Sequence, residues 1–288
     1  MKKLLLSLVA LMAISMTANA QYAKLYKGET LVNQYSKDVV DKVEFSQTSA
    51  NMLNGHEYVE IEGVKWATMN LGATTVAGSP ETCYGNYYAW GATTTWYKTK
   101  TWSSSSWSFS NWHSSPNKSA GYSDTNGAYC TGTANTYSKY TGSSSDNKET
   151  LESIDDAATA AWGGTWRMPT KADFVALRNA CGGSYNTTAK PTSISGTDTK
   201  GVYWCDNCDG VAGVLFVLDS THKVFFPAAG YVSGTSFLNG GSYGAYWSSS
   251  LNTSGTNYAY RLRFYSSNVT PANGYGRYYG FTVRPVSD

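Results

Sequence analysis

The sequence predicts an α+β fold in which an antiparallel sheet dominates and only two short segments are helical. The chain carries 23 Tyr and 10 Trp among 288 residues, and aromatic side chains favour the pleated, half-buried surface of a sheet. From Gly201 onward, strand-like runs follow one another, separated by Gly, Asn, Ser and Asp. Helix signals occur in two places only, before and after residues 163–169. With 41% hydrophobic residues, the chain can bury a substantial core.

The first twenty residues have the pattern of a secretory signal peptide. Lys2 and Lys3 precede the apolar run Leu4–Met12, and the sequence ANA at 18–20 predicts cleavage before Gln21. The apolar run is too short to span a bilayer, and no later stretch is long enough, so we expect no membrane insertion after signal removal. No cysteine directly follows the signal region, which argues against a bacterial lipid anchor. We therefore expect an exported protein, at the cell surface or extracellular.

Residues 21–50 are predicted to form a β-hairpin leader module. Its strands are expected around Lys24–Tyr26, Leu31–Gln34 and Lys42–Phe45, with a turn at residues 27–29. The small and polar residues 46–56 then interrupt the pattern. A domain boundary is expected there, and the main domain is expected to cover residues 57–288.

The main domain opens with a strand and turn around Gly63. Residues 91–150 contain few aliphatic side chains, and we expect a long insertion of loops held by Trp102, Trp107 and Trp112. A helix is predicted at Asp155–Trp162, with acidic residues in its first turn and Gly163-Gly164 after its end. A second helix is predicted from an N-cap at Thr170, three residues before Asp173, to about Ala180. The strands expected after it are GVYW, VAGVLFVL, KVFFPAAGYV, GAYWSSS, YAYRLRFY and YGFTVRPV.

The strand around residues 258–265 shows a clear two-residue alternation. Because successive side chains of a strand point to opposite faces, its residues divide into two sets. The set expected in the core is Tyr260, Leu262 and Phe264, and the set expected to be exposed is Arg261, Arg263 and Tyr265. The same argument predicts that Phe281 and Val283 are packed and that Thr282 and Arg284 lie at the surface. Exposed side chains can change at little cost in stability, so these positions are free to vary.

The five cysteines leave at least one thiol unpaired within the chain. Cys205 and Cys208 form a C-x-x-C pair, for which a local disulfide or two free thiols are the simplest interpretations. A zinc site would need two more ligands, and His56, His113 and His222 have no characteristic spacing. A thioredoxin-like redox role lacks the surrounding strand and helix. No metal site is predicted.

The sequence gives no signal for catalysis or for nucleic acid. The formal net charge is only +2, so no basic field favours nucleic acid or an anionic membrane. Asp155 and Asp156 are explained as helix-start residues, and Asp206 and Asp209 as turn formers. The sequence DNCDG lacks the spaced ligands of an EF-hand. We expect no catalytic residue and no cofactor, and therefore a protein that is not an enzyme.

Five ordered motifs carry a resemblance to a known family. They are GVKWATMNLGA, WGGTWRMPT, FFPAAGY, YWSSS and GFTVRPV, and they span about residues 57–288. They are similar to the exported Bacteroidetes family called the Fibrobacter succinogenes major paralogous domain, which resembles the C-type lectin-like fold in its formylglycine-generating-enzyme variety. The hairpin module resembles leader segments found ahead of such domains.

The resemblance does not carry over the activities known for this fold. Its enzymes use a C-terminal pair of cysteines as copper ligands, and this chain has no cysteine after Cys208. Its calcium-dependent sugar-binding members use Glu-Pro-Asn or Gln-Pro-Asp together with Trp-Asn-Asp, and none of these triplets occurs here.

A narrower resemblance concerns the last fifty residues. The frame YWSSSLN…AY.L.F.S.NV.P…..R..GF.VRPVSD is similar to the variable repeat of target proteins of diversity-generating retroelements, in which adenines of the template are copied with errors. This resemblance implies a variable region at about residues 243–279, where eight tyrosines fall, a composition typical of a paratope. The residues expected to bind ligand are Tyr243, Thr256, Tyr258, Arg261, Arg263, Tyr265, Thr270, Ala272, Gly274, Tyr275, Gly276, Tyr278 and Tyr279.

The function expected from these patterns is recognition of an unknown protein or cell-surface ligand by a hypervariable face. A fixed adhesin or pilus-tip subunit with one constant partner is the first alternative, and an exported enzyme of the formylglycine-generating type is the second. If the face is only a contact surface, the chain is expected to fold after joint replacement by Ala of Arg261, Arg263, Tyr265, Tyr275, Tyr278 and Tyr279.

Overall fold

The structure is a computed structural model. It describes the backbone of residues 2–7, 12–15, 22–27, 30–36 and 40–46, and all atoms of residues 51–113, 121–142, 146–186 and 188–288. The chain divides into two units, Met1–Asn51 and Met52–Asp288. The cleavage site expected before Gln21 and the turn residues 28–29 lie outside the described residues.

The first unit consists of short strands. Two fall in the predicted signal region and three in the predicted leader module. The strands of the leader module are each longer than predicted, and β3 and β4 form an antiparallel pair that β2 extends. β5 pairs in parallel with β1 and not with β4. The bounds are β1 (Lys2–Ser7), β2 (Met12–Ser15), β3 (Tyr22–Lys27), β4 (Thr30–Ser36) and β5 (Val40–Ser46).

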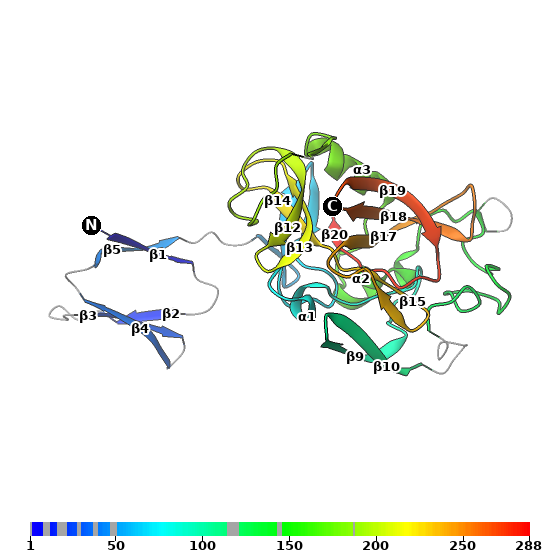
Figure 1. The fold of residues 1–288 in the computed structure, drawn as a ribbon, viewed down its shortest axis with the longest axis horizontal. Coiled ribbons are helices and arrows are strands. Elements are labelled where there is room, and N and C mark those ends of the chain that lie inside the picture. The colour runs from blue at the N-terminus through cyan, green and yellow to red at the C-terminus, as the bar shows by residue number, and fades with distance from the viewer. Residues whose placement is uncertain are drawn as a thin grey trace. The chain divides into compact units, whose positions relative to one another are not determined.

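The second unit is built mostly from antiparallel strands, with few helices (Figure 1). Its sheets have the orders β20-β8-β7-β6, β11-β12-β13-β14 and β17-β18-β19, and two further hairpins are β9–β10 and β15–β16. In these sheets the short β11 runs parallel to β12, whereas the other pairs with a described register run antiparallel. The bounds are β6 (Asn51–Leu53), β7 (His56–Ile61), β8 (Val64–Ala67), β9 (Tyr97–Ser103), β10 (Ser106–Trp112), β11 (Tyr185–Asn186), β12 (Gly201–Cys208), β13 (Val211–Val217), β14 (Lys223–Pro227), β15 (Tyr231–Ser233), β16 (Ser236–Leu238), β17 (Tyr243–Leu251), β18 (Tyr258–Tyr265), β19 (Asn268–Gly276) and β20 (Val286–Ser287).

The two predicted helices are present, and the first begins later than expected. α2 (Ala157–Trp162) starts after a separate 3-10 turn, η3 (Ser153–Asp155). The Asp156 side chain caps α2 by accepting hydrogen bonds from Ala158 N (2.8 Å) and Thr159 N (3.0 Å), so the helix begins after Asp156. α3 (Lys171–Ala180) has the predicted bounds. Its N-cap Thr170 and Asp173 exchange hydrogen bonds as a capping box. A third helix, α1 (Pro80–Cys83), was not predicted.

Residues 91–150 contain a hairpin where only loops were expected. β9 and β10 pair with Trp107 opposite Trp102, and the left-handed Ser104 and Ser105 form the turn between the strands. In β10, Trp107 and Phe109 alternate with the exposed Ser108 and Ser110, which is the two-residue period of a strand. The serines hid this period because they lack the bulk that usually marks strand residues.

Residues 281–287 lie between parts of the second unit that are distant in sequence. Phe281 and Tyr88 exchange backbone hydrogen bonds (2.8 and 3.0 Å), and Thr282 O accepts from Trp247 N (3.0 Å). Further along, Val283 O accepts from Leu71 N (2.9 Å), and β20 pairs with β8. This segment is hydrogen-bonded along both edges, and residues 281–287 are all buried, so its two faces are covered as well.

That cover makes the predicted surface position of Thr282 and Arg284 wrong, because both side chains are 0% exposed. Thr282 Oγ1 donates to Tyr84 O (3.2 Å). Arg284 donates from Nη2 to Phe225 O (2.8 Å), from Nε to Asn70 Oδ1 (2.9 Å), and from Nη1 to the carbonyls of residues 67 and 68 (2.9 and 2.5 Å). Burial lowers the pKa of Arg284 to about 10, so the guanidinium stays charged at neutral pH.

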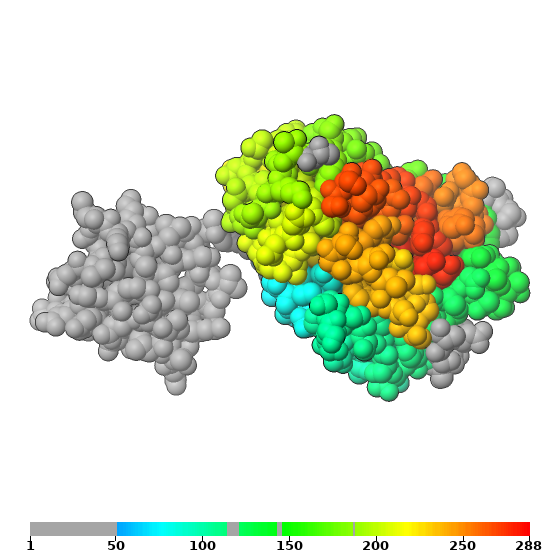
Figure 2. Space-filling view, in the orientation of Figure 1, coloured from blue at the N-terminus to red at the C-terminus, as the bar shows by residue number. Residues whose placement is uncertain are grey.

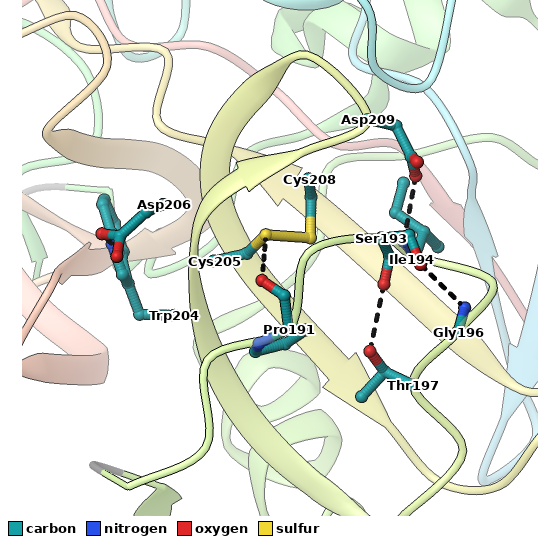
Figure 3. Close-up of a disulfide and its surroundings, with 10 residues drawn as sticks. All are labelled: Pro191, Ser193, Ile194, Gly196, Thr197, Trp204, Cys205, Asp206, Cys208 and Asp209. Atoms are coloured by element: carbon teal, nitrogen blue, oxygen red, sulfur yellow. Dashed lines mark hydrogen bonds between the residues drawn. A yellow bond between two sulfur atoms is a disulfide. The ribbon is translucent and has the colours of Figure 1, made fainter.

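The C-x-x-C sequence lies where β12 turns into β13. Cys205 and Cys208 form a disulfide, one of the two states that the sequence left open, and both residues are fully buried. Figure 3 shows the bridge beside Pro191, with Asp209 Oδ2 accepting from Ile194 N (2.9 Å) in the adjoining loop. Cys83, Cys130 and Cys181 are free thiols.

Removing this disulfide is expected to have a modest effect. It closes a loop with only two residues between its cysteines, so in the chain-entropy account the variant Cys205→Ala/Cys208→Ala loses about 2 kcal/mol of unfolding free energy. Urea unfolding with and without a thiol reductant measures the loss, and the double variant, unlike the wild type, should be insensitive to reductant. A loss above about 4 kcal/mol would show that the bridge does more than close this loop.

Candidate binding surface

The sheet β17-β18-β19 carries most of the residues expected to bind ligand. In β17 and β18, Tyr243 lies opposite Tyr265, and Ala245 lies opposite Arg263. Tyr246, Leu262 and Phe264 are fully buried in the core, as the alternation predicted for Leu262 and Phe264. The core position predicted for Tyr260 is wrong, because Tyr260 is only half-buried and its ring lies beside Lys171. α3 packs against these strands.

The opposite side of the sheet, here called the outer face, bears the other set of side chains. In Figure 2, the atoms of residues from about 230 onward, coloured gold to red, form one contiguous area of the surface toward the viewer. On the outer face Tyr243 and Tyr265 stack across the strands, with ring centroids 6.3 Å apart and an interplanar angle of 2°. The residues of the outer face are Tyr243, Ala245, Arg261, Arg263, Tyr265, Thr270, Asn273 and Tyr275.

Arg261 forms the floor of the outer face, and its predicted exposure is wrong, because it is only 3% exposed. Its guanidinium carbon lies 3.9 Å from the ring centroid of Tyr275 and 4.7 Å from that of Phe281. Nε and Nη2 donate to Asn273 Oδ1 (3.2 and 3.1 Å), and Nη2 also donates to Tyr243 Oη (3.0 Å). Burial lowers the pKa of Arg261. The aromatic rings of neighbouring segments cover this residue, so it belongs partly to the scaffold.

Arg263 lies two residues further along β18 and is half-buried. Its Nη2 donates to Thr270 Oγ1 (3.2 Å), whose hydroxyl donates to Asn268 Oδ1 (2.6 Å). The guanidinium carbon lies 5.6 Å from the ring centroid of Tyr265. Arg263 Nε is buried, and within the described residues it has no hydrogen-bond partner. Arg263 therefore has donor capacity that the protein does not use.

A tyrosine-lined cleft of about 210 Å³ lies beside the outer face. The Tyr279 ring lies 4.3 Å from that of Tyr278 and 4.6 Å from that of Tyr275, measured between centroids. Burial raises the pKa of Tyr275 to about 12 and also raises that of Tyr278, so both phenols are neutral at physiological pH. The cleft is lined by Asn135, Tyr258, Tyr275, Gly276, Tyr278 and Tyr279.

Arg277 supports the loops around the cleft from below. It is 0% exposed, and its guanidinium donates to the carbonyls of Tyr140 (3.0 Å), Thr256 (3.1 Å) and Lys139 (3.0 Å). The guanidinium carbon lies 3.9 Å from the ring centroid of Tyr137. Arg277 is one of the residues that define the frame described for the last fifty residues, and its burial shows that it packs inside the protein.

The structure brings ten of the thirteen predicted binding residues to the outer face or the cleft. The other three lie elsewhere. Ala272 lies at the register shift between Thr270 and Asn273. A Cβ on Gly274 would meet Asn252 Nδ2 at 2.5 Å, so the Asn252 side chain fills the space beside Gly274. Thr256 contributes its carbonyl to Arg277.

Sequence reasoning missed three residues at this surface. Asn135 comes from a distant loop, and no local signal marks it. Tyr231 packs edge-on against Tyr279, with the ring centroids 6.0 Å apart. Its sequence AAGYV predicted a strand but gave no sign of a place at the binding surface. Asn273 accepts from Arg261, and the alternation of β19 was the signal available for it.

Comparison with known proteins gives one match. The model of a domain of unknown function, DUF8237, matches residues 216–286, a range that contains β17, β18, β19 and the cleft residues 275–279. Neither the curated proteins nor the solved structures contain a match to the chain. Among the described residues, none of the helices has the length and apolar character needed to cross a membrane.

Proposed function

We propose that this chain is an exported ligand-binding protein that recognises a surface or protein ligand through the outer face and the tyrosine cleft. One observation carries the proposal. Most of the positions that the sequence frame leaves open gather around the outer face and the cleft, whereas frame residues such as Leu262, Phe264 and Arg277 are fully buried. We further propose that the second unit has the C-type lectin-like fold, which its five motifs favour.

The chemistry of this surface suits recognition. Tyr258 is 42% exposed and stands at the cleft, where it can bury aromatic area on a ligand. Tyrosine offers a large contact area and a hydroxyl at a low cost in side-chain entropy. Tyr275, Tyr278 and Tyr279 contact one another, so much of their freedom is already lost before a ligand arrives.

Diversification is the finer part of this proposal, and sequencing tests it. The 3′ end of the gene and its flanking DNA would be sequenced deeply across a population. Substitutions confined to codons such as 258, 263, 265, 275, 278 and 279, with an adenine-rich near-copy close by, are the expected result. An invariant 3′ end without a near-copy would instead favour the fixed adhesin with one constant partner.

Binding through the cleft is expected to depend on its tyrosines. Peptides selected on the wild-type protein from a phage-displayed random library serve as the probe. The variant Tyr258→Ser/Tyr278→Ser/Tyr279→Ser is expected to bind them at least about thirtyfold more weakly, because it removes three aromatic contacts of the kind that dominate interfaces. Biolayer interferometry measures the affinities.

The control is the variant Tyr58→Ser/Ile154→Ser, which removes apolar side chains away from the cleft; Ile154 is 77% exposed. It should bind the selected peptides as the wild type does. If the triple variant retains full affinity while its unfolding curve is unchanged, the cleft is not the binding site.

A further inference from the structure

Residues 220–287 carry basic side chains and no acidic ones. Residues 220–287 include Lys223 and four arginines and no Asp or Glu. Lys223 pairs with Asp198, while Arg277 and Arg284 are enclosed and donate to carbonyl oxygens. Arg261 and Arg263 remain, both on the outer face.

Within the part of the chain that the structure describes, these two guanidinium groups have no counter-ion. Neither forms an ion pair with any residue that the structure describes. Their partners are neutral, Asn273 and Tyr243 for Arg261 and Thr270 for Arg263. Because residues i and i+2 of a strand point to the same side about 6–7 Å apart, two like charges face the same region. An anion placed there would relieve their repulsion and accept a hydrogen bond from Arg263 Nη1, which has no partner among the described residues and, unlike Nε, is not buried.

We propose that the outer face binds an acidic polypeptide segment, whose Asp or Glu carboxylate is held by Arg263 with support from the charge of Arg261. This inference rests on the proposed function and names the ligand class of the same surface. A guanidinium presents a fork of donors that matches a carboxylate, and hydrogen bonds to an ionised acceptor are among the stronger ones. Arg263 is the primary contact because its donors are less used than those of Arg261.

The surroundings favour a polypeptide over a neutral sugar. Tyrosine rings flank the arginines, and tyrosine and arginine together are typical of protein-binding hot spots. Neutral sugars present many hydroxyls, each of which needs acceptors as well as donors. None of residues 220–287 supplies a carboxylate for that purpose.

One acidic residue limits where the ligand carboxylate can lie. Burial and then the neighbouring Tyr279 raise the pKa of the Tyr278 phenol, and the charge of Asp124 adds a smaller effect in the same direction. A carboxylate at the cleft would be repelled by Asp124. We therefore place the ligand carboxylate over β18 and the remainder of the ligand over the tyrosines.

The test uses the full chain and fluorescein-labelled hexaglutamate, with fluorescence anisotropy as the readout. Hexaglutamate is expected to bind at low ionic strength and to weaken as salt approaches about 0.15 M, where the Debye length falls to about 8 Å. Arg263→Gln is expected to weaken binding about tenfold, a larger loss than most interface residues show but smaller than that of a hot spot. Neutral hexaglutamine should not bind.

The matched control is Arg178→Gln. Arg178 is also half-buried, its Nε also has no partner among the described residues, and it lies on α3, on the other side of the sheet. It should bind hexaglutamate as the wild type does. Equal weakening by the two variants, or no wild-type binding, would overturn the proposal. Binding of polygalacturonate without binding of hexaglutamate would also overturn it, in favour of an acidic polysaccharide.

The same phage-selected peptides separate this inference from the proposed function. Peptides selected on the wild type are expected to be enriched in Asp and Glu, and those selected on Arg263→Gln are not. If the peptides depend on the cleft tyrosines but show no acidic enrichment, and hexaglutamate does not bind, the inference fails and the proposed function stands. If neither the cleft tyrosine substitutions nor Arg263→Gln changes the affinity for the peptides, the proposed function fails.

Discussion

Replacing Arg284 by Leu is expected to lower the free energy of unfolding by about 4 kcal/mol. The side chain is fully buried and donates to three backbone carbonyls and to Asn70 Oδ1. Asn70 in turn donates to Tyr246 Oη (3.1 Å), and that hydroxyl donates to Pro227 O (2.6 Å). Leucine fills part of the volume but leaves buried acceptors unpaired, and each costs about 1–3 kcal/mol.

Urea unfolding of the full chain measures this loss. Arg284→Lys keeps the charge but cannot reproduce the planar fork, so it is expected to recover less than half of the lost stability. Arg178→Leu, on α3, is the control and should stay within about 1 kcal/mol of the wild type. An Arg284→Leu protein as stable as the wild type would show that the buried network does not contribute to stability.

Replacing Arg261 by Ala is expected to cost about 3 kcal/mol, whereas Arg263→Ala is expected to cost less than about 1 kcal/mol. Arg261 packs its guanidinium on Tyr275 and Phe281 and is almost fully buried, so truncation opens a cavity beneath the outer face. Arg263 is half-buried, and among the described residues its hydrogen bond is to Thr270. The expectation that both arginines can be replaced without cost is therefore revised for Arg261.

Arg261→Met separates packing from charge. Its unbranched side chain refills most of the volume and removes a desolvated charge, so we expect it to cost less than half of what Arg261→Ala costs. Thermal unfolding of the three variants measures the order. If Arg261→Ala and Arg263→Ala are equally mild, Arg261 is a contact residue only, as its place in the alternation first indicated.

The fold could be predicted where the signal is local. The capping box at Thr170 and Asp173 lies within four residues, and α3 has the predicted bounds. The start of α2 was placed too early because two adjacent acids were treated alike. Asp155 accepts from the hydroxyls of Tyr129 and Tyr140, which are distant in sequence, and only Asp156 caps the helix. Such long-range partners leave no trace in a local pattern.

The candidate site could be predicted only in part, because the pattern of a strand is local as well. A two-residue period tells which face of a strand a side chain joins, and it correctly separated Leu262 from Arg263. The period does not tell what lies over that face. Arg261 is covered by Phe281 and Tyr275, and Arg284 is enclosed by the carbonyls of residues 67, 68 and 225. These two residues and Thr282 were wrongly expected at the surface because other segments of the chain cover them.

The position of residues 281–287 determines which mutations in the preceding codons still allow the protein to fold. These residues follow the predicted variable region and supply partners to Leu71, Tyr88 and Trp247, which belong to earlier parts of the second unit. Missense substitutions in codons 243–279 leave the sequence of this closing segment intact. A frameshift in the same codons would rewrite it entirely and leave those partners unpaired and the core open. Any chain that reaches the native state has thereby kept its translational frame, so folding itself screens out frameshifted products.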